Sequence, residues 1–234
     1  MHKLAVTKKK KEEAVAPEQA LDAAPTFKLG MVHLSGGMRR GISQFGATTV
    51  SRSLIAAAKD KEIDAIVFRI DSGGGEALAA ETIWQAVKEV QERYKKPIIA
   101  SFGNVCASGG YYVAAPCDKI VASPVTITGS IGVASARPVL LPKLFEALGI
   151  SFDEIGFSEG YKNATFLRKL EGSAKERYEK HLDAVYDLFL KRVAEGRDID
   201  FTHLKENLAG GRVFSGLDAK ENGLVDVLGI HLVI

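Results

Sequence analysis

The chain has 234 residues, of which 46% are hydrophobic and 26% charged, and its formal net charge is +2. This length supports one core of good size with at most a small appendage, and the balanced charge excludes the basic footprint of a nucleic-acid-binding protein. Two cysteines, Cys106 and Cys117, are too few for a disulfide framework and lack the spacing of a metal site, so we expect two small apolar side chains and neither a metal nor a cofactor.

The first 25 residues combine a lysine run with an acidic stretch rich in alanine and proline. They lack the apolar core of a secretory signal, and no apolar run in the chain approaches the roughly 18–20 residues that span a membrane. We therefore expect a disordered arm over residues 1–25, with at most a peripheral contact with an anionic membrane, and a single domain over residues 26–234. The cellular compartment stays open.

Strand and helix patterns alternate along the rest of the chain. Strands are expected from Phe27 onward and over residues 64–70, 97–101, 119–122 and 150–157. Helices are expected over residues 48–60, after residue 75, over 108–115 and 138–148, and from Ser173 to just before Gly196. The continuous apolar centre of residues 64–70 is typical of a parallel strand buried on both faces. This alternation predicts an α/β fold with a largely parallel sheet and flanking helices.

The last of these helices has two further expected features. Ser173-Ala-Lys-Glu176 has the spacing of a capping box. The side chains expected on its inward face are Tyr178, Leu182, Val185, Phe189 and Val193.

Two glycine-rich turns follow expected strands, where open parallel sheets place their sites. The first, Asp71-Ser-Gly-Gly-Gly75, lacks the lysine of a phosphate-binding loop and the spacing of a dinucleotide fingerprint. It is either a simple tight turn or a source of backbone N–H donors for an oxyanion.

The second turn, residues 103–110, places Ser108 where a helix begins. A serine in this position is by default an N-cap, but the small neighbours Ala107 and Gly109 would also let a substrate carbonyl approach its hydroxyl. The five histidines lie in no acid–base pattern, so a Ser-His-Asp triad has no support.

Four short motifs occur in a recognisable order: Asp71-Ser-Gly-Gly-Gly75, Ala107-Ser-Gly-Gly-Tyr-Tyr112, Thr128-Gly-Ser-Ile-Gly-Val133 and Gly160-Tyr-Lys-Asn-Ala164. With the segment 211–226, they resemble bacterial signal peptide peptidase A of the protease IV family. The resemblance covers residues 27–229 and implies a Clp/crotonase-like fold.

The resemblance also implies roles for individual residues. Ser108 would be the nucleophile, and Lys162 its general base. The main-chain N–H groups of Gly74 and Gly109 would form the oxyanion hole, and Ser130 would orient the lysine. Such an enzyme hydrolyses peptides with apolar side chains, such as cleaved signal peptides or membrane-derived peptides.

A lysine base makes a chemical demand on its surroundings. A free lysine has a pKa of about 10.4, so a working base needs its pKa lowered by about 2–3 units. Burial beside apolar side chains lowers a lysine pKa, and Tyr161 and Phe166 are compatible with burial of Lys162. The other lysines considered for this role are Lys169, Lys119 and Lys175.

Gly73 departs from the family pattern, which has proline at this position. Glycine leaves the backbone freer, so we expect the oxyanion turn to be less preorganised than in the relatives. Short relatives form rings in which the lysine reaches the serine of a neighbouring subunit, so we expect a homo-oligomeric ring with a shared dyad. The alternatives are a catalytically silent ring scaffold that binds peptides and a crotonase-type acyl-CoA enzyme.

Overall fold

The computed structural model describes residues 27–135, 142–153, 155–156 and 169–229. Within them, a seven-stranded sheet has the order β1-β2-β3-β4-β7, with β5 pairing β3 and β6 pairing β5. All of these pairs are parallel except β5 with β6. The strands are β1 (Leu29–Ser35), β2 (Ala65–Ser72), β3 (Ile98–Ala107), β4 (Lys119–Ala122), β5 (Ile127–Gly129), β6 (Val213–Ser215) and β7 (Val227–Leu228).

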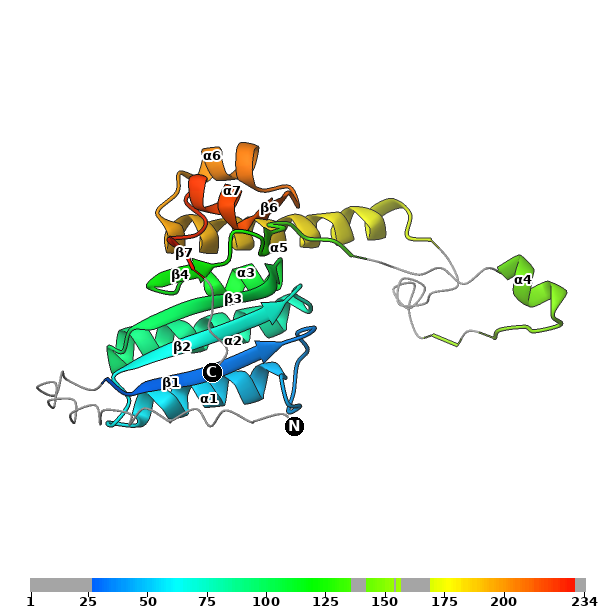
Figure 1. Cartoon of the computed structure of the whole chain (residues 1–234). Coiled ribbons are helices and arrows are strands. Elements are labelled where there is room, and N and C mark those ends of the chain that lie inside the picture. The colour runs from blue at the N-terminus through cyan, green and yellow to red at the C-terminus, as the bar shows by residue number, and fades with distance from the viewer. Residues whose placement is uncertain (1–26, 136–141, 154, 157–168, 230–234) are drawn as a thin grey trace, which may run out of the picture.

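Helices cover this sheet and extend from it. They are α1 (Ala47–Lys59), α2 (Ala77–Glu89), α3 (Gly109–Ala114), α4 (Pro142–Ala147), α5 (Gly172–Arg197), α6 (Phe201–His203) and α7 (Gly216–Glu221), with π turns at Val90–Tyr94 and Leu204–Leu208. Figure 1 shows α1 and α2 side by side along β1–β3, and α5 with its N-terminal half extending away from the sheet towards α4. The expected α/β fold with a largely parallel sheet is confirmed.

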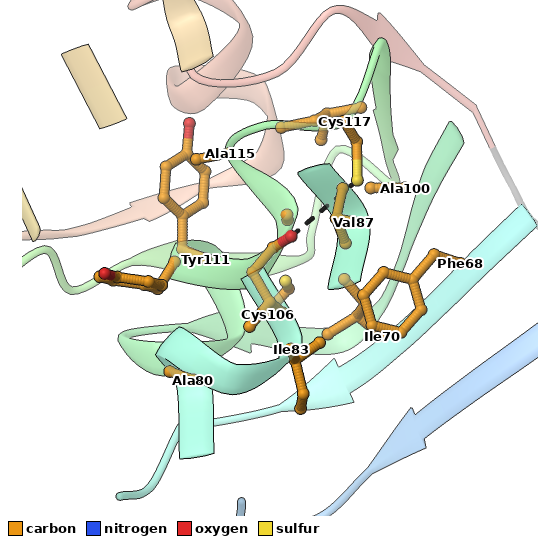
Figure 2. Packing of buried hydrophobic residues seen from close by; sticks show 14 of the residues in the cluster. Phe68, Ile70, Ala80, Ile83, Val87, Ala100, Cys106, Tyr111, Ala115 and Cys117 are labelled. Atoms are coloured by element: carbon orange, nitrogen blue, oxygen red, sulfur yellow. Dashed lines mark hydrogen bonds between the residues drawn. The ribbon is translucent and has the colours of Figure 1, made fainter. Parts of the chain in front are cut away.

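The core lies between one face of the sheet and the helices. Ile66, Phe68 and Ile70 of β2 are fully buried, and Figure 2 shows Phe68 and Ile70 close to Ile83 and Val87 of α2. On the opposite face, the side chains of β2 are only half-buried, and those of the neighbouring β1 are exposed. The expectation that residues 64–70 are buried on both faces is therefore wrong, because nothing in the described residues covers that face beside β1.

Strand β3 continues six residues beyond the end predicted for it and ends immediately before Ser108. A register shift between β2 and β3 makes this extension possible. At the shift, the Asp71 carboxylate accepts a hydrogen bond from the Val105 N–H at 3.1 Å. A Cβ added at Gly103 would lie 2.5 Å from Asp71 Cγ, so glycine is required where β3 passes this side chain.

One prediction for the middle of the chain is wrong. The residues described between 150 and 156 form no strand; Phe152 packs on Phe145 instead, with ring centroids 5.0 Å apart, and Ile155 is 94% exposed. The helix predicted over 138–148 is confirmed in its described part as α4, and residues 138–141 lie outside the described residues. Leu144 of α4 and Leu148, which follows it, are exposed to solvent.

The long helix α5 also differs from its prediction. It starts at Gly172 without a side-chain cap, and the Ser173 hydroxyl accepts a hydrogen bond from Arg177 rather than forming a capping box. Of the predicted inward face, only Phe189 and Val193 are fully buried, because the N-terminal half of the helix has left the body. The helix runs through Gly196, where a Cβ would lie 2.4 Å from the Ala115 carbonyl oxygen.

Candidate functional site

Ser108 has an unusual backbone conformation between β3 and α3. Its φ is 53° and its ψ is −122°, a region that costs a residue other than glycine about 1–3 kcal/mol. The Ser108 N–H donates to the Gly129 carbonyl at 2.9 Å, and the Ser108 carbonyl accepts from the Tyr112 N–H at 2.9 Å. Ser108 is the N-cap residue of α3, as considered from the sequence, but its side chain makes no capping hydrogen bond. The surrounding structure holds a strained serine whose hydroxyl is not used as a cap.

The turn containing Gly74 packs directly against this serine. Gly74 has a φ of +97°, which favours glycine. A Cβ added at Gly74 would lie 2.6 Å from the Gly109 nitrogen and 2.9 Å from Ser108 Cβ. The structure therefore brings together Ser108, Gly109 and Gly74, three of the five residues predicted for the site.

Met38 holds the glycine-rich turn in place. Its N–H donates to the Gly74 carbonyl at 2.8 Å, and its carbonyl accepts from the Glu76 N–H at 3.0 Å. The Met38 side chain is 1% exposed and lies where a Cβ on Gly109 would collide with its methyl group, at 2.4 Å. Met38 thus holds the turn in place, although Gly73 stands where the family pattern has proline. No sequence signal indicated Met38, which acts through backbone bonds across a long sequence separation.

The Ser72 hydroxyl forms a second brace inside the same turn. It donates to the Gly36 carbonyl at 2.6 Å and accepts from the Gly74 N–H at 3.1 Å. One of the two predicted oxyanion donors therefore already has a partner, and binding an oxyanion there would require exchanging this bond. Ser72 was quoted within its motif but given no role; a short hydroxyl two residues before a turn glycine is a known signal for such a bond.

Ser130 lies in the segment next to Ser108. It follows Gly129, whose carbonyl accepts from the Ser108 N–H, and its own N–H donates to the Arg212 carbonyl at 2.6 Å. Like Ser108, it has a positive φ, of 49°. Lys162, the predicted base, lies outside the described residues.

A cavity of about 230 Å³ opens beside Ser108. Its walls come from the residues at the start of α2, from the Ser108 turn, from the stretch after β5 and from α5. They are mainly apolar, although Glu76 contributes a carboxylate, and they include Ala77, Gly109, Tyr112, Val133, Val185 and Phe189. The Tyr112 and Phe189 rings pack against each other with centroids 5.0 Å apart. A cavity of this composition next to a reactive hydroxyl suits an apolar side chain.

Burial controls the ionisation of the groups around the site. Burial, with a further contribution from Cys117, raises the pKa of the Cys106 thiol well above its ordinary value, and burial also raises the pKa of Cys117. Burial, together with a hydrogen bond to Glu81, raises the pKa of Tyr112. At the rim, the hydrogen bond from Arg40 lowers the pKa of Glu76. Thus the thiols and the Tyr112 hydroxyl stay protonated at neutral pH.

Two features are absent from the described residues. They contain no group of three or more histidine, cysteine, aspartate or glutamate residues placed to hold a metal ion. None of their helices is both long enough and apolar enough to cross a membrane.

A family model and several relatives connect the chain with one family of peptidases. The family model described as peptidase family S49 matches residues 90–231. The chain is similar to the chloroplastic serine protease SPPA of Arabidopsis thaliana (37% identity, 86% of this chain and 30% of the relative) and to protease 4 of Haemophilus influenzae (34%, 86% and 33%). A Synechocystis relative described as a protease is 37% identical over 86% of this chain and 70% of its own length. The chain thus spans about a third of the length of the first two relatives.

Proposed function

The chain belongs to peptidase family S49, and on this basis we propose that it is a serine endopeptidase with Ser108 as its nucleophile. The strained backbone of Ser108 carries the proposal. Strain of this kind persists only where the surrounding structure enforces it, and it concentrates at functional sites. Here it presents the hydroxyl beside Gly74 and the apolar cavity.

In the proposed reaction, Ser108 Oγ attacks the substrate carbonyl and gives its proton to the Lys162 amine. The N–H groups of Gly109 and Gly74 stabilise the oxyanion, the latter after exchanging its bond with Ser72. Lys162 then protonates the leaving amine, and water hydrolyses the acyl-enzyme. Ser130 would orient the lysine from its position beside the Ser108 turn.

Two of the other lysines are poorly suited to be the base. Lys119 is 3.7 Å from Asp226, and Lys175 is 3.7 Å from Glu179, and both amines are mostly exposed. Neither lysine is among the residues that line the cavity beside Ser108. Lys119 also begins β4, at the end of the sheet remote from Ser108. These positions support Lys162 by weakening its competitors.

The proposed substrates are peptides with apolar side chains, including cleaved signal peptides and membrane-derived peptides. The support is the mainly apolar lining of the cavity, to which Val133, Val185 and Phe189 contribute. Such a cavity favours an aliphatic or aromatic side chain over a charged one, because burying an unpaired charge is costly.

We also propose that the chain forms a homo-oligomeric ring in which Lys162 serves the Ser108 of a neighbouring copy. The segment around α4 presents exposed apolar side chains away from the sheet, including Leu148 at 64% and Ile155 at 94% exposure. Apolar side chains on a projecting segment are suited to contact another copy, and a head-to-tail contact can close into a ring. Light scattering tests this: Leu148→Asp and Ile155→Asp together should lower the oligomeric mass and the turnover, whereas unchanged mass would contradict the contact.

The dyad is tested with an apolar fluorogenic peptide and a serine-directed fluorophosphonate probe. Ser108→Ala should abolish both turnover and labelling, and Lys162→Ala should abolish turnover, while Lys169→Ala and Ser53→Ala serve as matched controls. Full activity in Ser108→Ala or Lys162→Ala would refute the role of that residue.

A silent peptide-binding scaffold is the second candidate, because the Gly74 N–H already has a partner in Ser72. Peptide binding by a wild-type protein that shows neither turnover nor labelling would favour it.

A further inference from the structure

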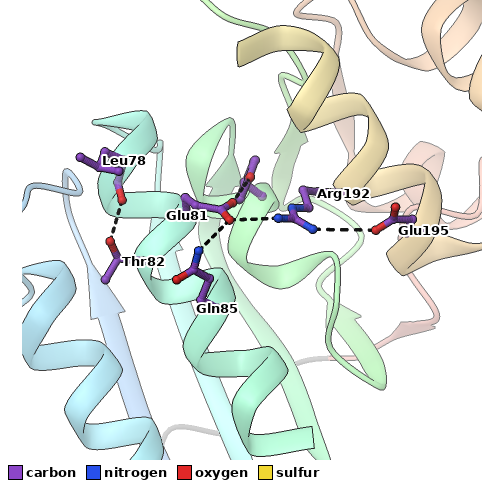
Figure 3. Close-up of polar contacts among 7 residues, drawn as sticks. Leu78, Glu81, Thr82, Gln85, Arg192 and Glu195 are labelled. Atoms are coloured by element: carbon purple, nitrogen blue, oxygen red, sulfur yellow. Dashed lines mark hydrogen bonds and ion pairs between the residues drawn. The ribbon is translucent and has the colours of Figure 1, made fainter. Parts of the chain in front are cut away.

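A polar cluster joins three helices behind the cavity. Glu81 of α2 accepts a hydrogen bond from the Tyr112 hydroxyl of α3, and its other oxygen lies 3.0 Å from the Arg192 guanidinium of α5. The Gln85 amide donates to that second oxygen at 3.1 Å. Figure 3 shows Glu81 between Gln85 and Arg192. The side chains of Glu81 and Arg192 are 18% and 23% exposed, so this ion pair is largely removed from solvent.

Arg192 has a second contact that fixes its position. Its guanidinium carbon lies 3.5 Å from the centroid of the Trp84 ring, which is a cation–π arrangement. A planar guanidinium can stack on an indole and bind a carboxylate at the same time, whereas a lysine ammonium reproduces only the charge. The cluster therefore depends on geometry as well as charge.

The same three helices shape the cavity. Tyr112 lines it from α3, and Val185 and Phe189 line it from α5. Phe189 and Val185 precede Arg192 by three and seven residues, a spacing that places all three on one side of the helix. The bond between Arg192 and Glu81 therefore also sets how close Phe189 lies to Tyr112. The centroids of these two rings are 5.0 Å apart.

We propose that Glu81 and Arg192 are positioning residues that fix the Tyr112–Phe189 wall of the cavity and thereby select the substrate side chain that enters it. This inference rests on the proposed peptidase function. Tyr112 and Phe189 would contact the side chain directly, whereas Glu81 and Arg192 would act through them. Loosening the cluster lets α5 move away from α3, so the wider cavity accepts bulky aromatic side chains that the native cavity disfavours relative to leucine.

A merely structural role makes a different prediction. A cluster that only stabilised the fold would lower the activity towards all substrates alike, and the ratio between two substrates would not change. The informative quantity is therefore the ratio of kcat/KM for peptides that differ only in leucine or phenylalanine before the scissile bond.

The experiment compares Arg192→Met, Arg192→Lys and Glu81→Gln with wild type. Asp187→Asn is the matched control, because it removes an exposed ion pair of α5 with Lys205. Each variant is assayed for the leucine-to-phenylalanine ratio, for the rate of labelling by a small fluorophosphonate and for melting temperature. Arg192→Lys is the mildest change and keeps the test valid if a harsher variant fails to fold.

We expect the ratio to fall about tenfold in Arg192→Met and Glu81→Gln, mainly through KM, which is the lower end of the about 10–200-fold discrimination that one methylene makes in an apolar pocket. Arg192→Lys should fall between Arg192→Met and wild type, and the labelling rate should stay near the wild-type value. An unchanged ratio in folded variants overturns the proposal.

Failure of the peptidase function would give a separate result, in which wild type shows neither turnover nor labelling. The same ratio is then measured as the relative affinity for fluorescent product peptides ending in leucine or phenylalanine. A shift in that ratio supports the positioning role, and its constancy overturns it.

Discussion

Replacing Ser108 by glycine should stabilise the protein relative to replacing it by alanine. The backbone of Ser108 has a φ of 53°, which alanine would have to keep and glycine adopts freely. Relief of this strain contributes about 1–3 kcal/mol, and the greater freedom of glycine in the unfolded chain offsets about 0.4–1 kcal/mol of it. A net gain of about 0.5–2 kcal/mol follows, which corresponds to about 1–8 °C in Tm for a chain of this size.

Calorimetry and urea unfolding of the two variants measure this difference directly. A matched pair, Ser53→Gly and Ser53→Ala, lies at an exposed position in the middle of α1, where glycine should instead be less stable by about 1 kcal/mol. Both Ser108 variants should lack turnover. A Ser108→Gly protein that melts below Ser108→Ala would refute the strain, and with it the observation on which the assignment of the nucleophile depends.

Further predictions concern the glycine turn and the thiols. Gly74→Ala should lower kcat by about 10²–10³-fold, because its Cβ would collide with Gly109 and displace an oxyanion donor, whereas Gly73→Ala, with nothing within 4 Å of its Cβ, should retain most activity. Equal activity of the two variants would contradict this packing. Cys106 and Cys117 should resist a thiol reagent in the native protein and react after denaturation, while an added Ser53→Cys reacts at once; rapid native labelling of the first two would show that they are not buried.

The sequence was sufficient where a single element determines its own structure. The apolar run of β2, the helical spacing of apolar residues in α1 and the position of Ser108 at a strand end are local patterns. The prediction of a strand over 150–157 was wrong because an apolar run forms a strand only where a neighbouring strand pairs with it. Phe152 packs on the ring of Phe145 instead.

Long-range contacts limited the prediction of the site. The backbone hydrogen bonds of Met38 to the glycine turn join residues about 36 positions apart in sequence. No residue pattern within either segment predicts these bonds. The cluster of Glu81, Tyr112 and Arg192 depends likewise on how three helices pack. The roles of Gly74 and Gly109 were predicted from the resemblance of short motifs, and the structure adds the reason for glycine, because a Cβ at either position would collide with its neighbours.

The shape of α5 gives the cavity a mechanical connection to a distant part of the chain. Of its 26 residues, only Phe189, Leu190 and Val193 are fully buried, so the helix is clamped near one end. At about 1.5 Å per residue, Gly172 stands about 25 Å from Phe189, and a tilt of about 5° at the clamp moves that tip by about 2 Å. Any tilt of α5 at the Tyr112–Phe189 wall of the cavity would therefore be largest at Gly172, which lies ten residues after Lys162 in sequence.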